Sequence, residues 1–348
     1  SFMLDFTVPV SPRTNGCPEK PGAAQAAVFH CARDVTRHVY QRITVHDYLR
    51  TVMFPGVVDK ILAGGPKHYR PLRGYRAFMP LEYSVAAFRF GHTMVRGAYD
   101  HNRNFGRPAP GQTERPLIPF APFDLLFLFT GNGFLRDPDD STKSIRNPFG
   151  GTPTLPFNWI IEWDRFTDKG DPEEGRFARK IDTRLAPPLT TEGMVNEGTA
   201  PPIQDEASKA LRVLLRHLAR RNLLRGYLLS IPTGQAVAAE MGVAPLTEEE
   251  LRRGNTPRVN AALDEGGFLR NTPLWYYVLK ESEVRADGNA LGELGSRIVC
   301  ETIIGLLRLD RNSIYNERGW TPVDAVRLPN GDPIVTIRDF LRFAGVMA

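Results

Sequence analysis

The sequence predicts a mainly α-helical protein, with many helices joined by long ordered loops. Apolar residues recur with the helical period through most of the chain. Helix boundaries carry local signals: Thr233 is a candidate N-cap, Thr247 opens a Thr-Glu-Glu-Glu start, and Gly242 is a candidate C-terminal stop. With 348 residues, the chain is long enough to bury a core and a cofactor-sized cavity.

The expected helices follow this period in chain order. We expect them at residues 22–51, 55–64, 80–100, 121–129, 206–226, 233–241, 247–253, 257–265, 273–283, 291–308 and 335–346. The segment 131–202 is rich in Gly, Pro, Asp and Thr, which favours ordered loop over the core. We expect residues 1–27 to form an N-terminal extended arm and residues 28–348 to form one helical domain.

Charge and hydropathy argue against nucleic-acid binding and against a membrane span. The net charge is +5, but no run of five or more cations occurs. In the densest basic stretch, residues 212–225, five leucines mark a helix with a buried stripe, so nucleic-acid binding is not expected. No apolar run reaches the roughly 18 residues of a membrane span, and no signal-peptide pattern opens the chain. We expect a cytoplasmic protein, or a secreted one if a signal segment precedes Ser1.

The cysteines and the first three histidines do not form a metal site. Cys17, Cys31 and Cys300 are odd in number and widely spaced, which predicts free thiols and neither a disulfide framework nor a zinc site. Three histidines lie eight residues apart, at His30, His38 and His46. Eight helical steps rotate by about 80°, so these rings do not converge on one metal.

The most informative stretch is residues 83–105, because it places His92 between two arginines on an apolar helix face. At about 100° per residue, four apolar or aromatic residues lie within about 60° of His92: Val85, Phe88, Val95 and Tyr99. Arg89 and Arg96 fall on the same side. A haem needs an apolar slot, one neutral imidazole and cations for its propionates. The alternative is an ordinary buried histidine with its ring N–H satisfied.

The run Ala-Phe-Arg-Phe-Gly-His-Thr at residues 87–93 resembles the proximal-histidine helix of the haem peroxidases of the peroxidase–cyclooxygenase superfamily. The resemblance implies a haem-peroxidase-like multi-helix fold and haem b as cofactor. It also implies that His92 ligates the haem iron and that Arg89 meets a haem propionate. The fatty-acid oxygenases of the superfamily carry a tyrosine where this chain has Arg89, so the resemblance favours the peroxidase branch.

Other segments extend the resemblance over most of residues 30–345. Residues 32–49 are similar to a family helix with an Ala-Arg start and an Asp-aromatic-Leu close, and residues 272–277 and 291–307 resemble bacterial members. Residues 221–226, Arg-Asn-Leu-Leu-Arg-Gly, followed by Ile-Pro-Thr, resemble the family's Asn-Leu-Gln-Arg-Gly segment with its later Leu-Pro-Ser. That likeness implies that Asn222 accepts a hydrogen bond from the proximal histidine. Taken alone, Asn222 has the alternative interpretation of a helix-end residue.

The resemblance covers the proximal half of a peroxidase. In the family, the distal histidine with its calcium-binding aspartate, and a catalytic arginine, precede the helix matched here by residues 28–50. Residues 1–27 contain no histidine and one arginine, Arg13, so neither the distal residues nor the calcium site is found. Three explanations stay open: a separate or cleaved chain, a sequence that begins inside a longer protein, and loss of the segment.

Together these observations predict a haem-dependent peroxidase that oxidises a small organic donor with hydrogen peroxide. His92 and Asn222 are the expected catalytic residues, Arg89, His92 and Asn222 the cofactor-binding residues, and His92 the metal ligand. A separate chain or segment that supplies the distal side is a further expected partner. The alternative is a non-catalytic or partial peroxidase-like scaffold that binds little or no haem and acts through partner contacts.

Overall fold

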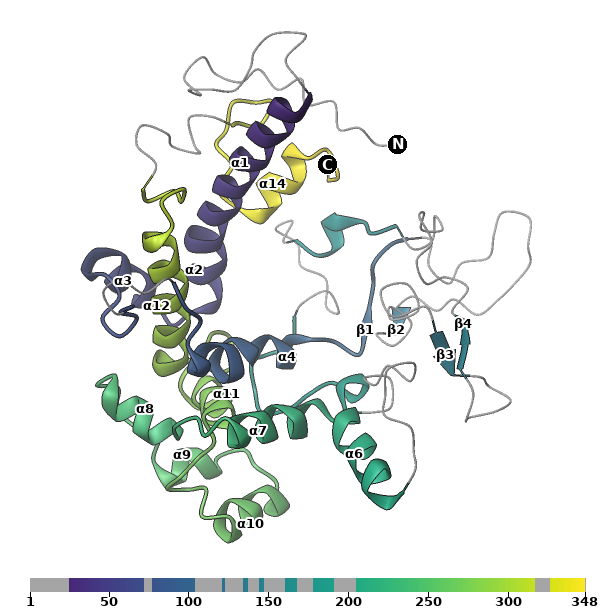
Figure 1. Ribbon diagram of the computed structural model, residues 1–348, viewed down its shortest axis with the longest axis vertical. Coiled ribbons are helices and arrows are strands. Elements are labelled where there is room, and N and C mark those ends of the chain that lie inside the picture. Colours follow the sequence, from purple (N-terminus) through teal and green to yellow (C-terminus); the bar gives the residue numbers. More distant parts are fainter. Residues whose placement is uncertain are drawn as a thin grey trace. The chain divides into compact units, whose positions relative to one another are not determined.

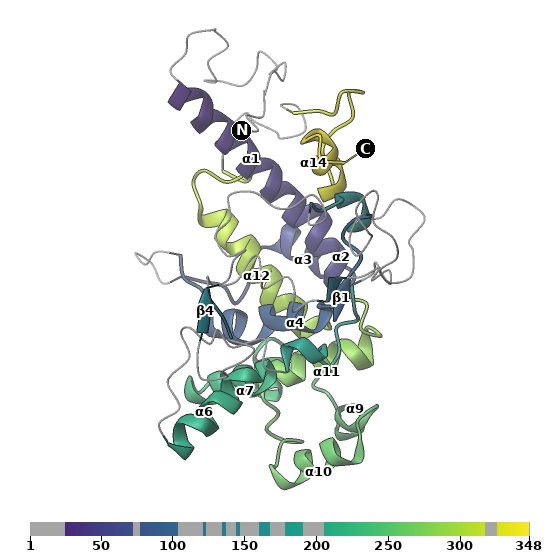
Figure 2. The same cartoon turned by 90° about the vertical axis from the view of Figure 1, so that its right-hand side faces the viewer.

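The computed structural model describes residues 25–71, 77–103, 121–122, 134–136, 144–146, 160–167, 178–190, 205–316 and 326–347, and it is mainly helical (Figures 1 and 2). This confirms the predicted fold class. The chain divides into two compact units: Ser1–Met79 with Val299–Ala348, and Pro80–Ile298. Residues 1–24 of the expected N-terminal arm lie outside the described part.

The first unit begins with a long helical run. α1 (Gln25–Ile43) continues through a π-helical turn, η1 (Thr44–Tyr48), into α2 (Leu49–Val52), where the sequence predicted one helix over residues 22–51. α3 (Val57–Gly64) and α14 (Ile337–Phe343) belong to the same unit. Its core contains Val39, Ile43, Val326 and Ile334, with Phe340 and Phe343 of α14 packed against them.

Among the described residues, most helices lie in the second unit. They include α6 (Glu206–Arg216), α7 (Leu218–Leu228), α8 (Gly234–Glu240), α9 (Glu248–Arg252), α10 (Pro257–Glu265) and α11 (Leu274–Arg285). α12 (Glu293–Leu309) begins in this unit and ends in the first. Two short 3-10 helices, η5 (Trp163–Arg165) and η6 (Pro187–Leu189), lie in the loop-rich part.

Two short antiparallel strand pairs complete the second unit. β1 (Ala98–Tyr99) pairs with β2 (Ala121–Pro122), and β3 (Phe134–Arg136) pairs with β4 (Ser144–Arg146). The predicted helix at residues 121–129 is therefore wrong for its first two residues, which pair with the chain after α4 (Gly91–Met94). Residues 123–130 lie outside the described part.

The capping signals read from the sequence are confirmed. The Thr233 side chain accepts the N–H of Ala236 at the start of α8, and Thr247 forms a capping box with Glu250 at the start of α9. Gly242 has a φ of +62°, which suits the stop after α8. The predicted helix over 206–226 is instead two helices, because His217 leaves helical geometry with φ −105° and ψ 103°.

α11 lies at the centre of the second unit, where it contacts α7, α8, α9 and the segment that precedes α4. Two of its charged residues, Lys280 and Glu281, are buried. Lys280 is fully buried, and its Nζ contacts the carbonyl of Arg253 and lies 2.9 Å from Oδ1 of Asn255. The buried Glu281 carboxylate accepts the N–H of Leu294 at the start of α12, at 3.0 Å. Both groups thus have polar partners, as buried charges require. Burial nevertheless lowers the pKa of Lys280 and raises the pKa of Glu281.

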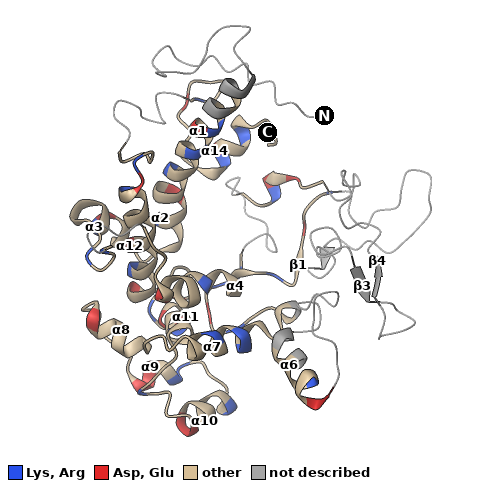
Figure 3. Cartoon of the chain, viewed as in Figure 1, with Lys and Arg blue, Asp and Glu red and all other residues tan. Residues whose placement is uncertain are grey.

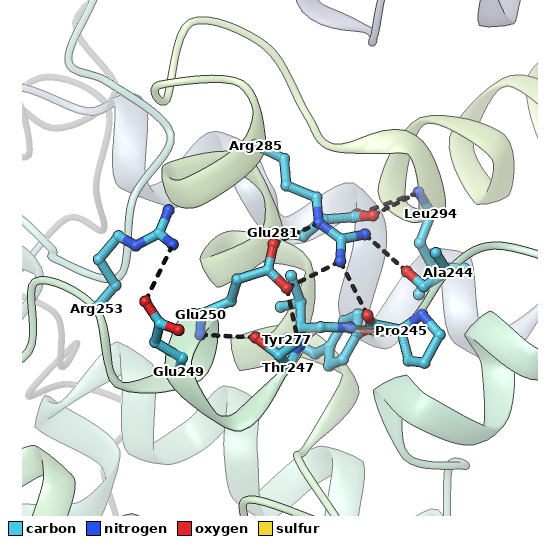
Figure 4. A network of polar contacts seen from close by, with 11 residues as sticks. Ala244, Pro245, Thr247, Glu249, Glu250, Arg253, Tyr277, Glu281, Arg285 and Leu294 are labelled. Carbon is cyan, nitrogen blue, oxygen red and sulfur yellow. Dashed lines mark hydrogen bonds and ion pairs between the residues drawn. The ribbon is translucent and has the colours of Figure 1, made fainter.

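A second polar network joins α9 to α11 (Figure 4). The Arg285 guanidinium donates to both carboxylate oxygens of Glu250, at 2.9 and 3.0 Å, and to the carbonyls of Ala244 and Pro245. These hydrogen bonds from Arg285 lower the pKa of Glu250 from its ordinary 4.5 to about 2. The charged form of Glu250 therefore stabilises the folded state.

The Glu250 pairing predicts a defined loss of stability in acid. Because the folded pKa is depressed, the contribution is complete above pH 4.5 and is lost as the pH falls towards about 2. We expect Glu250→Gln to lower the free energy of unfolding at neutral pH and to flatten its dependence on pH in this window. Urea unfolding at a series of pH values measures this. Glu249→Gln is the matched control, because Glu249 is 89% exposed and 4.0 Å from Arg253. An unchanged pH dependence in Glu250→Gln would contradict the pairing.

A close approach between α8 and α11 predicts a second stability effect. A Cβ added at Gly234 would lie 2.0 Å from Cγ of Tyr277, which is fully buried and whose hydroxyl accepts the N–H of Leu246. We expect Gly234→Ala to cost about 1–3 kcal/mol in the free energy of unfolding, since neither helix can shift freely. Gly64→Ala, at an exposed helical site with open space around it, is the control and should be neutral or slightly stabilising. Equal stabilities of the two variants would show that α8 and α11 are less closely packed than described.

Candidate functional site

The segment that carries His92 is helical but not one regular α-helix. It runs as a π-helical turn, η2 (Glu82–Ala86), a 3-10 turn, η3 (Ala87–Phe90), and one α-helical turn, α4 (Gly91–Met94). Ala86 marks the change, with φ −123° and ψ −79°. A constant 100° per residue therefore does not describe which side chains share a face here.

The predicted helix over residues 80–100 is wrong beyond Met94. Val95 is extended, with ψ 133°, and the Met94 carbonyl accepts the N–H of Arg179 at 3.1 Å. Tyr99 lies in β1, where its hydroxyl accepts the N–H of Arg96. The backbone N–H of Arg179, from a distant segment, thus satisfies a free carbonyl at the end of α4. Val95, Arg96 and Tyr99 do not share a helix face with His92.

The aromatic residues before His92 divide between the core and the surface. Tyr83 and Phe90 are buried, whereas Phe88 is 41% exposed. The Phe88 ring stacks on Tyr83, with centroids 4.6 Å apart, and meets Phe90 edge-on at 6.2 Å. Phe88 thus keeps apolar surface accessible four residues before the histidine.

The three residues expected in the site converge. Nδ2 of Asn222, on α7, lies 3.1 Å from Nδ1 of His92, on α4, although 130 residues separate them. Nη1 of Arg89 donates a hydrogen bond to Oδ1 of the same Asn222 side chain. Asn222 is 1% exposed and His92 is half-buried. The amide is therefore held between a guanidinium and an imidazole, with α7 lying alongside α4 (Figures 1 and 2).

Besides its hydrogen bond to Asn222, two further hydrogen bonds hold Arg89 in place. Its Nε donates to the carbonyl of Ser84 in the π-helical turn, at 3.1 Å. Its own carbonyl accepts from Nε1 of Trp275, on α11, at 3.4 Å. Neither contact could be predicted from the sequence, because the irregular turn that places Arg89 against Ser84 and Trp275 has no periodic signal.

The site is electrostatically positive. Burial lowers the pKa of Arg89, and the charges of Arg225 and Arg221 lower it further. Burial also lowers the pKa of His92, followed by the charges of Arg89 and Arg221. Arg221 and Arg225 are four residues apart and share a face of α7. Figure 3 marks Lys and Arg positions on this helix. In the sequence, both arginines belong to the amphipathic stretch 212–225 and to the run 221–226 that resembles the family, but neither was expected in the site.

Other candidate metal-binding residues lie elsewhere and are structural. His38 is buried in the first unit, with Nε2 2.7 Å from the carbonyl of Asn312. Cys300 is buried and free, and burial raises the pKa of its thiol to about 12, which fits the core-packing interpretation. Cys17 and the Cys31 side chain lie outside the described residues. Within the part of the chain that the structure describes, no group of three or more His, Cys, Asp and Glu residues could hold a metal ion.

Comparison with known families adds independent evidence. Residues 18–118 match the animal haem peroxidase family. This confirms the resemblance to the peroxidase–cyclooxygenase superfamily and supports a peroxidase-type function at family level. The matched part is less than a third of the chain; it includes Arg89 and His92, whereas Asn222 lies outside it. No curated protein matches the sequence significantly. Across the described residues, every helix is too short or too polar to span a membrane.

The charges around His92 predict a measurable change in its titration. Replacing Arg221 by Gln removes one of the cations that lower the pKa of His92, so we expect that pKa to rise. NMR titration of the histidine C–H signals in the cofactor-free protein measures this. Arg220→Gln is the matched control, because the Arg220 charge acts on His217 and should move that histidine instead. A response of His92 to Arg220→Gln but not to Arg221→Gln would contradict the described arrangement of α7.

Proposed function

We propose that this protein is a haem-dependent peroxidase, which oxidises a small organic donor with hydrogen peroxide. His92 would ligate the iron of haem b, Asn222 would hold the imidazole from behind, and Arg89 would meet a propionate. The observation that carries the proposal is the contact between Asn222 and His92, since two residues far apart in sequence lie side by side. The resemblance implies that the amide accepts from the imidazole, whereas here Nδ2 of Asn222 faces Nδ1 of His92 and its oxygen faces Arg89. The match of residues 18–118 to the family supports the proposal.

The chemistry of the imidazole suits a metal ligand. Nδ1 of His92 is occupied by Asn222, so Nε2 is the nitrogen that would bind iron. A histidine ligand must be neutral, and a pKa below the ordinary 6.5 favours the neutral form at physiological pH. A fixed partner on the second nitrogen orients the ring, and a neutral amide withholds the electron density that a carboxylate would add.

The surroundings of the imidazole suit a dianionic, largely apolar cofactor. Burial lowers the pKa of Arg89, and the charges of Arg225 and Arg221 lower it further, so carboxylates placed beside Arg89 would favour its charged form. Phe88 would offer apolar surface to the macrocycle. When bound, haem supplies the iron that reacts with peroxide; the residues of this chain bind it and orient its ligand.

The distal side of the site is a separate part of the proposal. Activation of peroxide needs a base and a cation next to the bound oxygen, and general acid–base assistance alone is worth about 10²–10⁴ in rate. The segments that resemble the family supply neither group. We therefore propose that a separate chain or segment supplies them, and that the proximal residues alone support only weak turnover.

Reconstitution with haem tests the proposal. We expect the protein mixed with haemin to show a Soret band and to oxidise a phenolic donor with peroxide. His92→Ala should lose nearly all haem retained after gel filtration, because the variant lacks the proposed iron ligand. His217→Ala is the control, since this half-buried histidine lies at the start of α7 and outside the proposed site.

The possible outcomes separate the proposal from its alternative. Unchanged haem content in His92→Ala would refute the ligand assignment. A wild-type protein that stays colourless would favour the non-catalytic scaffold that acts through partner contacts. Bound haem without turnover would support a proximal half-site that needs its distal complement.

A further inference from the structure

α7 exposes a cluster of apolar side chains at its C-terminal end. Tyr227 and Leu228, in its last turn, are 81% and 68% exposed, and Leu223 and Leu229 beside them are also exposed. The buried face of the same helix is formed by residues four positions apart: Leu218, Asn222 and Gly226. Single apolar residues scattered over a surface are ordinary, whereas neighbouring ones form a patch that marks a contact surface.

The charge around these apolar residues is of one sign. Arg220, Arg221 and Arg225 are exposed on the same helix. The chain contains no Asp or Glu from residue 207 to residue 239, which includes the whole of α7. A complementary partner therefore brings negative charge together with apolar surface.

The shape of the cluster favours a lipid layer over a protein groove. Successive residues of a helix differ by about 100°, so the side chains of residues 227, 228 and 229 leave α7 over a range of roughly 200°. A protein groove receives one face of a helix, whereas lipid chains can surround a projecting end. Tyrosine suits this boundary, because its ring is apolar and its hydroxyl stays in the polar layer.

We propose that the C-terminal end of α7 is a binding surface for anionic lipid membranes. Tyr227, Leu228 and Leu229 enter the boundary between headgroups and acyl chains, and the three arginines contact the negatively charged headgroups. At 11 residues, α7 is about 16 Å long and does not cross a bilayer, so the association is peripheral and reversible. The proposal is independent of haem, because Asn222 lies on the buried face of the helix.

Cosedimentation of the full chain with lipid vesicles tests the proposal. We expect binding to vesicles that contain phosphatidylserine, weaker binding in high salt, and little binding to phosphatidylcholine alone. Leu228→Ser should lower the partition coefficient roughly tenfold, because it removes one inserted side chain. Arg220→Gln should lower it about fivefold. Both residues are exposed, so these variants should keep the wild-type fold.

A matched variant separates insertion from a general loss of surface apolarity. Val259 is an exposed apolar residue on α10, and Val259→Ser should bind vesicles as the wild type does. Equal losses in Val259→Ser and Leu228→Ser would overturn the proposal, as would equal binding to neutral and anionic vesicles. Absence of vesicle binding would also overturn it. If the chain instead self-associates and Leu228→Ser abolishes this, the partner is a second copy and the membrane assignment is wrong.

Discussion

The contact between Asn222 and His92 is the constraint on which the rest of the site depends. An asparagine that is 1% exposed has donors and acceptors out of reach of bulk water, and an unsatisfied buried polar group costs about 1–3 kcal/mol. The imidazole and the Arg89 guanidinium occupy both ends of the amide. α7 and α4 are thereby held together at one register, because a shift of either helix would leave the amide without partners.

α11 provides the framework on which this contact is built. Its apolar residues fill the core of the second unit, and its polar atoms reach outward to neighbouring elements. Trp275 donates a hydrogen bond to the backbone carbonyl of Arg89. The Tyr277 hydroxyl accepts a backbone N–H just before α9, and the Glu281 carboxylate accepts a backbone N–H at the start of α12. Each bond ties a specific element to the buried helix. The position of the site therefore follows from the packing of α11 and not from the short α4 helix, which is only one turn long.

The sequence predicted the elements whose boundaries are set by local chemistry. The helix at 257–265 has the predicted bounds, and the Thr247 cap forms as expected, because a threonine side chain and the next turn suffice to start a helix. Boundaries set by distant residues were not predictable. The end of α4 depends on the Arg179 amide, and the break at His217 has no glycine or proline to mark it.

The same distinction applies to the site. Arg89 and His92 could be proposed from one short run, and Asn222 from a second, because both runs resemble a known family. Residue spacing could not predict that the three side chains are joined by hydrogen bonds. The π-helical turn changes the angle about the helix axis between residues 84 and 89, so a regular helix would not place them in contact. The roles of Ser84 and Trp275 depend entirely on that irregular geometry.

The choice of an amide at position 222 has an electrostatic consequence for the whole site. A carboxylate there would pair with Arg89 and neutralise part of the local positive charge, and it would stabilise the protonated imidazole. An amide satisfies the same hydrogen-bonding positions but carries no charge. Arg89 consequently remains a cation close to two others, beside an imidazole whose neutral form is favoured. A bound ligand that brings negative charge close to Arg89 would favour the charged guanidinium, whose pKa burial and the neighbouring arginines lower.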